Sequence, residues 1–169
     1  LFRSAGARRI LELLSQPREP LPPAHPVALP PAAPTGRAIT FEKVSFGYQP
    51  GQHVLSDFSL QVAAGETLAI IGPSGVGKST LLGLVPRFMD PDAGILRIDG
   101  IDLRQLSLAD LRKCIAWVPQ EPILLPGTIA ENLAYGRPGA SREEIRAAAE
   151  AAQAHAFIER LPQGYETVV

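Results

Sequence analysis

Cysteine is almost absent from this chain of 169 residues, and the single Cys114 excludes any disulfide within it. A reducing compartment is therefore the simpler expectation. No apolar run approaches the roughly 20 residues that cross a bilayer. The formal net charge of −1 offers no general attraction to nucleic acid. With 46% hydrophobic and 20% charged residues, the composition is that of an ordinary globular protein.

Methionine is equally scarce, and this bears on where the chain begins. The only methionine is Met89, and the first residue is Leu1 rather than an initiating methionine. Residues 164–169 end in an apolar stretch without a signal that terminates a helix. We therefore expect a piece of a longer protein, with one domain and its attachments.

Proline, in contrast, is concentrated near the start. Eight of the 17 prolines lie between Pro17 and Pro34, where they oppose helix and ladder pairing and favour a semi-rigid extended linker. A ligand for a proline-recognition domain is the less favoured alternative, because the segment joins two structured pieces. Before it, apolar residues at helical spacing predict an amphipathic helix. The expected parts are residues 1–16, 17–37 and 38–169.

Patterns typical of strands and helices alternate after the linker. A short continuous apolar run at residues 67–71 predicts a strand buried on both faces. Ser141 and Glu144 have the spacing of a capping box. We predict an α/β fold with a central sheet and an antiparallel element on its N-terminal side. Strands are expected at residues 38–45, 54–62, 67–71, 94–99 and 115–118, and helices at 79–85, 108–113, from Ser141 onward, and up to Pro162.

A glycine-rich loop lies between the expected buried strand and the expected helix at 79–85. It satisfies the pattern G-x-x-x-x-G-K-[ST], and it has the strand-to-helix context that this pattern requires. Its residues are Gly72, Pro73, Ser74, Gly75, Val76, Gly77, Lys78 and Ser79. The pattern predicts a loop that binds the phosphates of a nucleotide.

The residue types of this loop suit phosphate chemistry. Glycines let backbone N–H groups surround phosphate oxygens, and the N-terminus of the following helix adds positive potential. Lys78 would meet the β- and γ-phosphates, Ser79 would bind Mg²⁺, and Thr80 would add a phosphate contact. We predict binding of ATP with Mg²⁺. Kinases, GTPases, DNA-repair ATPases and transporter motors share such a loop, so its surroundings must distinguish them.

Two further segments resemble motifs of ATP-binding cassette (ABC) domains. They are residues 44–48 (V-S-F-G-Y) before the loop and 118–122 (V-P-Q-E-P) after it. The resemblance implies that Tyr48 stacks on adenine. It also implies that Gln120 meets Mg²⁺ and couples to the membrane part of a transporter.

Residues 124–133 (L-L-P-G-T-I-A-E-N-L) are similar to a stretch that marks exporter-type ABC transporters. The helix at residues 1–14 resembles the segment that descends from an exporter's last membrane helix. The resemblance spans essentially the whole chain and implies a P-loop NTPase fold of ABC type. That fold has a central, mostly parallel sheet, an N-terminal antiparallel element and part of a helical subdomain.

The resemblance also implies the setting of the parent protein. Such a parent couples ATP hydrolysis to export at the cytoplasmic face of the cell membrane. Its partners are a fused membrane domain and a second ABC ATP-binding domain, with no nucleic acid.

The sequence departs from the family pattern in one respect. The 169 residues contain no L-S-G-G-Q signature, no apolar strand ending in Asp-Glu and no switch histidine. We therefore expect an ATP-binding domain that is incomplete at its C-terminus, without a catalytic residue, and able to bind ATP without turnover. Glu121 and Glu131 receive no catalytic role. The histidines are expected at the surface: His25, His53 and His155.

Two other readings remain open. A soluble ABC ATPase that acts on DNA or in translation would share residues 72–80 and Gln120 but not the exporter-like residues 127–133. A non-catalytic module that holds ATP for assembly or regulation would suit the missing catalytic half.

Overall fold

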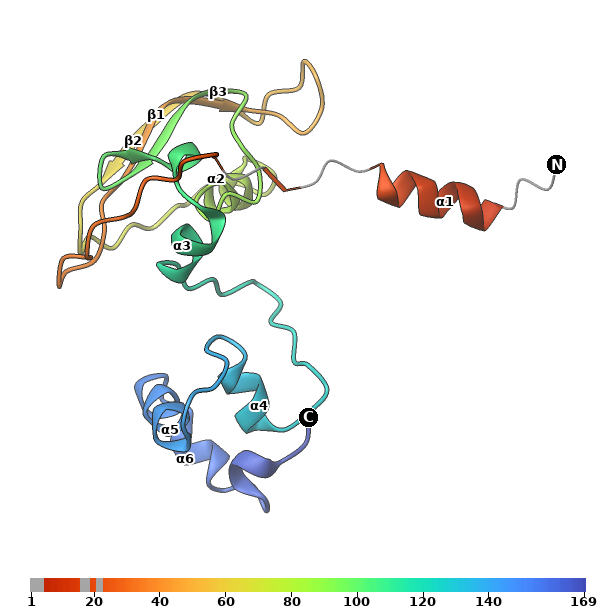
Figure 1. Ribbon diagram of the computed structural model, residues 1–169, viewed down its shortest axis with the longest axis vertical. Helices are drawn as coiled ribbons and strands as arrows, with labels where there is room; N and C mark the ends of the chain where they lie inside the picture. Colours follow the sequence, from red (N-terminus) through yellow and green to blue (C-terminus); the bar gives the residue numbers. More distant parts are fainter. Residues whose placement is uncertain (1–4, 16–18, 21–22) are drawn as a thin grey trace. The chain divides into compact units, whose positions relative to one another are not determined.

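The structure is a computed structural model that describes residues 5–15, 19–20 and 23–169 (Figure 1). It divides into two units, Leu1–Ala116 and Trp117–Val169. Residues 1–4 of the predicted first helix and parts of the predicted linker lie outside the described residues. Each unit is built from its own elements, and the first contains every strand that the structure describes.

The first unit is an antiparallel sheet with short helices. The sheet has the order β2-β1-β3-β4, with β1 paired to both β2 and β3. The helices predicted at 79–85 and 108–113 and three of the five predicted strands are found within one residue of the expected bounds. The helix expected up to Pro162, in the second unit, ends at Ile158. The elements are α1 (Ala5–Leu14), β1 (Ile39–Phe46), β2 (Leu55–Val62), α2 (Lys78–Leu84), β3 (Ala93–Ile98), β4 (Ile101–Asp102), η1 (Leu103–Gln105) and α3 (Leu108–Lys113).

Strand β1 contains an irregularity that changes which side chains face the core. Its pairing shifts register between Phe41 and Val44, and Lys43 between them has a left-handed φ of 49°. Regular alternation from Phe41 would bury residues 43 and 45. The bulge instead buries Phe41, Val44 and Phe46 together.

The core of the first unit joins the sheet to both helices that follow the loop. Leu81 and Leu84 of α2 and Leu111 of α3 belong to the same buried cluster as the inward side chains of β1 and β3. Figure 1 shows α2 and α3 beside this sheet. Burial of large aliphatic side chains is the main favourable term for such a unit. The loop that precedes α2 is thereby attached to a packed body.

The C-terminal end of α2 is stabilised by arginine side chains. The helix ends at Leu84, before Pro86, as expected of a proline. The Arg112 guanidinium donates hydrogen bonds to the carbonyl oxygens of Pro86 (3.0 Å) and Arg87 (3.3 Å). Buried Arg87 donates to both carboxylate oxygens of Asp90, at 2.7 and 2.9 Å. Carbonyl groups beyond the helix thus have charged partners.

The described part of the proline-rich segment contains no helix or strand, and it is held against the rest of the first unit. The N–H of Val27 donates to the carbonyl of Gln105 at 2.8 Å. Arg37 donates to the carbonyl of Pro30 at 2.8 Å, and Leu29 packs on the core cluster. The described part of the segment therefore packs along the unit as well as connecting α1 to β1.

Two predicted strands are corrected by the structure. Residues 67–71 and 115–118 are extended but belong to no strand. A strand needs a neighbour that exchanges backbone hydrogen bonds, and no described residues pair with either segment. Apolar side chains that a strand buried on both faces would cover are therefore exposed. Ile71 is 92% exposed and Val118 is 86% exposed.

The second unit is helical. Both α4 and α5 begin with a complete capping box, Thr128 with Glu131 and Ser141 with Glu144, and the second of these was predicted. Ile145, Ala149 and Ile158 are its buried apolar side chains. The elements are α4 (Ile129–Ala134), α5 (Arg142–Ala151), α6 (His155–Ile158) and η2 (Gly164–Glu166).

No helix among the described residues is both long enough and apolar enough to cross a membrane. The exposed apolar side chains of α1, which has ten residues, are Ile10, Leu11, Leu13 and Leu14.

The core assignment can be tested on helix α2. Leu84 is 1% exposed, so Leu84→Ala should lower the free energy of unfolding by about 2–5 kcal/mol. Leu82 on the same helix is 45% exposed, and Leu82→Ala should change it by less than about 1 kcal/mol. Urea unfolding followed by circular dichroism measures both. Equal losses for the two variants would contradict this description of the core.

Candidate nucleotide-binding site

The glycine-rich loop turns from the extended residues 67–71 into α2 through left-handed backbone. Gly75 has a φ of 81°, and Gly77, the residue before the helix, has a φ of 99°. A Cβ atom on Gly77 would also lie 2.9 Å from Cγ1 of Val54. Both the conformation and the close approach require glycine at position 77.

The loop presents backbone donors. Within the described residues, no hydrogen bond uses the N–H groups of Gly75, Val76 or Gly77. The first N–H groups of α2 add to them, because the first turn of a helix has no partners for its donors within the helix. Unpaired donors and the positive end of the helix dipole together favour an anion with several oxygens. The loop therefore fits a phosphate group.

Lys78 lies against this loop rather than extending into solvent. Its Nζ donates to the carbonyl oxygens of Gly72 (2.9 Å) and Pro73 (2.7 Å). The ammonium charge thus lies beside the backbone donors of the same loop. A phosphate bound by those donors would meet a positive charge at the same place.

Tyr48 and Thr80 are brought together by the fold. The two hydroxyl oxygens are 3.0 Å apart, and the rings of Tyr48 and Phe46 form a T-shaped pair with centroids 5.1 Å apart. Thr80 is buried (5% exposed), whereas Tyr48 is 63% exposed. The structure therefore holds an exposed aromatic ring next to the first turn of α2. The predicted phosphate contact of Thr80 stays a prediction, since its hydroxyl bonds to Tyr48.

The two predicted magnesium ligands lie in different units. Ser79 is exposed in the first turn of α2, in the first unit, and Gln120 is exposed in the second. Their joint binding of one ion stays a prediction. No group of three or more His, Cys, Asp or Glu side chains in the described part of the chain is placed to hold a metal ion.

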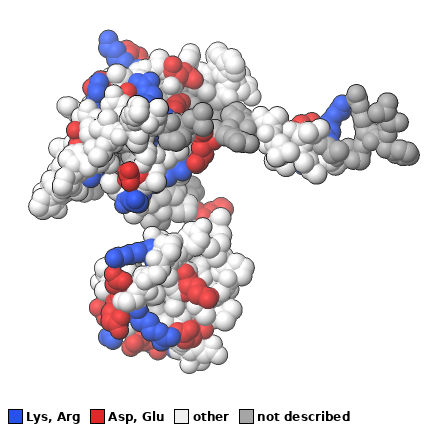
Figure 2. All heavy atoms as spheres, in the orientation of Figure 1, with Lys and Arg blue, Asp and Glu red and all other residues white. Residues whose placement is uncertain are grey.

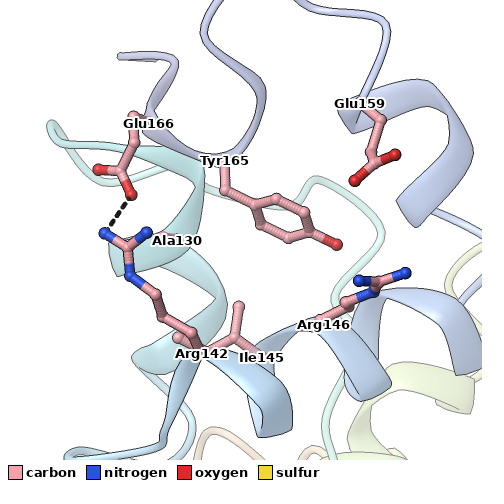
Figure 3. Close-up of a pocket in the computed structure, with 7 residues that line it drawn as sticks. All are labelled: Ala130, Arg142, Ile145, Arg146, Glu159, Tyr165 and Glu166. Carbon is pink, nitrogen blue, oxygen red and sulfur yellow. Dashed lines mark hydrogen bonds and ion pairs between the residues drawn. The ribbon is translucent and has the colours of Figure 1, made fainter.

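A pocket of about 180 Å³ lies within the second unit (Figure 3). Its charged side chains have partners close by: Arg142 donates to Glu166 at 3.0 Å, and Arg146 donates to Glu150 at 2.9 Å. No phosphate-loop residue lines it. The lining residues are Ala130, Arg142, Ile145, Arg146, Glu159, Tyr165 and Glu166.

His155 beside this pocket is a correction to the sequence prediction. It was expected at the surface, but its side chain is only 18% exposed, and Nδ1 is 2.8 Å from the Tyr165 hydroxyl. Burial, with the negative charge of Glu159, raises the pKa of Tyr165. The helical pattern around His155 does not predict its contact with Tyr165, which lies ten residues later in the sequence.

Charges of both signs are mixed on the surface. Figure 2 shows lysine and arginine side chains interspersed with aspartate and glutamate on the face that it displays. This agrees with the formal net charge of −1. No extended basic stripe of the kind that tracks a nucleic acid backbone appears on that face.

Sequence reasoning missed the residues that organise the chain after Gln120. Thr128 and Glu131 form the capping box of α4. The T-x-x-E spacing was a signal that could have found this cap. Asn132, which bonds back to Leu125, carried no such signal, because a single asparagine within a helix has no specific pattern.

Comparison with known proteins places these features in a family. The family model described as ABC transporter matches residues 55–168. A multidrug efflux ATP-binding/permease protein of Mycobacterium tuberculosis is 45% identical over 98% of this chain, and an ATP-dependent lipid A-core flippase of Desulfotalea psychrophila is 49% identical over 81% of it. The chain spans 14% and 24% of the lengths of these two proteins.

A solved structure has the same fold. The structure of a bacterial Atm1-family ABC exporter with ATP bound matches with a TM-score of 0.84 at 42% sequence identity. The match covers 96% of this chain and 28% of that one. It confirms the predicted α/β fold class and, with the relatives, the predicted resemblance to exporters. The strands that the structure describes pair only antiparallel, so they correspond to the predicted antiparallel element, and the mostly parallel sheet is not among them.

Proposed function

This chain belongs to the ABC transporter family, and from that premise we propose that it is the ATP-binding portion of an exporter. The observation that carries the proposal is the loop before α2. Left-handed Gly77, unpaired N–H groups and the Lys78 ammonium lie together there. Each is suited to the oxygens of a polyphosphate.

ATP would be held at both of its ends. Residues 72–80 (Gly72, Pro73, Ser74, Gly75, Val76, Gly77, Lys78, Ser79 and Thr80) would surround the phosphates with backbone donors, and the Lys78 charge would neutralise part of their charge. The exposed ring of Tyr48 would stack on the adenine base. Its hydroxyl bond to Thr80 supports this role, because it orients the ring relative to the helix that follows the loop.

Mg²⁺ would be bound by Ser79 and Gln120. Hydroxyl and amide oxygens are hard ligands of the kind that magnesium accepts, with water and phosphate oxygens completing its shell. When bound, the ion would neutralise phosphate charge. Ser79 lies in the first turn of α2, directly after Lys78, which supports its place beside the phosphates.

The parent protein would hydrolyse ATP to drive export across the cell membrane, with this portion at the cytoplasmic face. Its partners would be a membrane domain of the same transporter and a second ABC ATP-binding domain. The names of the relatives support this, since they include a multidrug efflux ATP-binding/permease protein and an ATP-dependent flippase. A soluble ABC ATPase is less well supported, because the relatives match the exporter-like segment as well as the loop.

The charge of Lys78 can be removed without disturbing the core. Lys78→Ala should abolish binding of a fluorescent ATP analogue, because a phosphate group loses its cationic partner. Titration of the analogue followed by anisotropy measures the affinity. Lys113→Ala is the matched control, since Lys113 is an exposed lysine of the same unit that pairs with Asp110. Unchanged affinity in Lys78→Ala would refute the site.

Two substitutions at Tyr48 separate its ring from its hydroxyl. Tyr48→Ala should weaken ATP binding by about tenfold or more, since base–aromatic stacking contributes about 1–3 kcal/mol. Tyr48→Phe keeps the ring and loses only the bond to Thr80, so it should bind much more tightly than Tyr48→Ala. Isothermal titration with ATP compares them. Equal weakening by both variants would mean that the hydroxyl, not the stacked ring, is what matters.

The 169-residue chain alone should bind ATP with negligible turnover. We assign no residue of this chain to activate the attacking water, and positioning that water is a required part of phosphoryl transfer to it. Phosphate release from ATP, measured over hours in the presence of magnesium, tests this. Steady release that disappears in Lys78→Ala would contradict it and would assign a base among these residues.

A further inference from the structure

Residues 118–127 form the segment that carries Gln120. It contains no helix or strand, and all of its described side chains up to Pro126 are exposed. Its apolar side chains are exposed too, among them Ile123 at 83% and Leu124 at 65%. An exposed segment of this kind adopts a fixed path only where hydrogen bonds hold it. We call residues 118–127 the Gln120 segment.

Asn132 supplies such hydrogen bonds at the C-terminal end of the segment. Its Oδ1 accepts from the N–H of Leu125 at 2.8 Å, and its Nδ2 donates to the carbonyl of Leu125 at 2.9 Å. The same Nδ2 donates to the carbonyl of Thr128 at 3.0 Å. The side-chain amide therefore pairs with Leu125 as a neighbouring β-strand would, and it uses both donor hydrogens and its acceptor.

The helix that bears Asn132 is itself well fixed. The N–H of Ile129 donates to the carbonyl of Thr167 (3.0 Å), and the N–H of Val169 donates to the carbonyl of Gly127 (2.9 Å). These two bonds flank an antiparallel bridge between Thr128 and Val168. A capping box at Thr128 completes the start of α4. Asn132 thus ties the Gln120 segment to a start of α4 that is bonded on both sides.

We propose that Asn132 is the positioning residue for Gln120. By holding Leu125, it limits the paths open to the four residues between Gln120 and Leu125, whose Cα atoms are at most about 17 Å apart. The proposal rests on the proposed function, in which Gln120 binds Mg²⁺. Loss of Asn132 would leave phosphate binding intact and would weaken the part of the affinity that depends on magnesium.

Glu131→Ala provides a matched control for general destabilisation of α4. It removes the Glu131 side of the capping box and should lower the stability of α4 about as much as the loss of another cap does. The three hydrogen bonds of Asn132 stay in place. Asn132→Ala removes those bonds. Asn132→Asp keeps the acceptor for the Leu125 N–H but places a carboxylate against two carbonyl oxygens, so it is a second variant with the same expected direction.

The experiment uses the 169-residue chain and measures two quantities, amide hydrogen exchange and ATP affinity. Hydrogen exchange at the Leu125 amide should become about tenfold faster or more in Asn132→Ala and Asn132→Asp, because the amide loses its partner or the segment is released. ATP affinity is then measured with magnesium and with EDTA. The magnesium-dependent gain should fall in both variants, the affinity in EDTA should not change, and Glu131→Ala should match the wild type in both quantities.

The outcomes separate this inference from the proposed function. Equal effects of Glu131→Ala and Asn132→Ala, or unchanged exchange at Leu125, would overturn the positioning role. A wild-type chain that binds ATP without any gain from magnesium would overturn the link from Asn132 to Gln120. A wild-type chain that binds no ATP would refute the proposed function, and exchange at Leu125 would still decide whether Asn132 holds the segment.

Discussion

The left-handed backbone at Gly77 is the constraint on which the first unit depends. Any other residue there would bear about 1–2 kcal/mol of backbone strain and would press a Cβ atom on Val54. Gly77 also precedes the first residue of α2, whose Leu81 and Leu84 enter the core against the sheet. The same turn therefore sets the direction of the loop's N–H groups and the register in which α2 packs. The conformation of the phosphate loop and the packing of the core therefore depend on the same residue.

The features that sequence reasoning predicted well are local. The loop pattern, the helix at 108–113 and the capping box at Ser141 depend on residues within a few positions, and the structure has the helix with the same bounds. The family and fold class followed from motifs of this kind and are confirmed. The bulge at Lys43 was not predictable, because its benefit is the joint burial of Phe41 and Val44 against distant residues.

The strands expected at 67–71 and 115–118 show the limit of pattern reasoning. A continuous apolar run indicates that burial would be favourable, but it carries no information about which segment pairs with it. In the candidate site, too, local patterns predict some features, and contacts between distant residues determine others. The loop with Lys78 lies within one unit and was predicted from a local pattern. The contact between Tyr48 and Thr80 lies within the same unit and is seen only in the structure. The role of Asn132 depends on a fold-back to Leu125 that no local pattern encodes.

Strand β2 lies at one end of the sheet order, so one of its edges has no neighbour in the described structure. An unpaired, regular edge is a template on which another chain can add a strand. Here the pairing of β1 with β2 shifts register twice, and Asp57, the third residue of β2, has a left-handed φ of 49°, so the edge strand is irregular. The irregularity that organises the core therefore also discourages edge-to-edge aggregation.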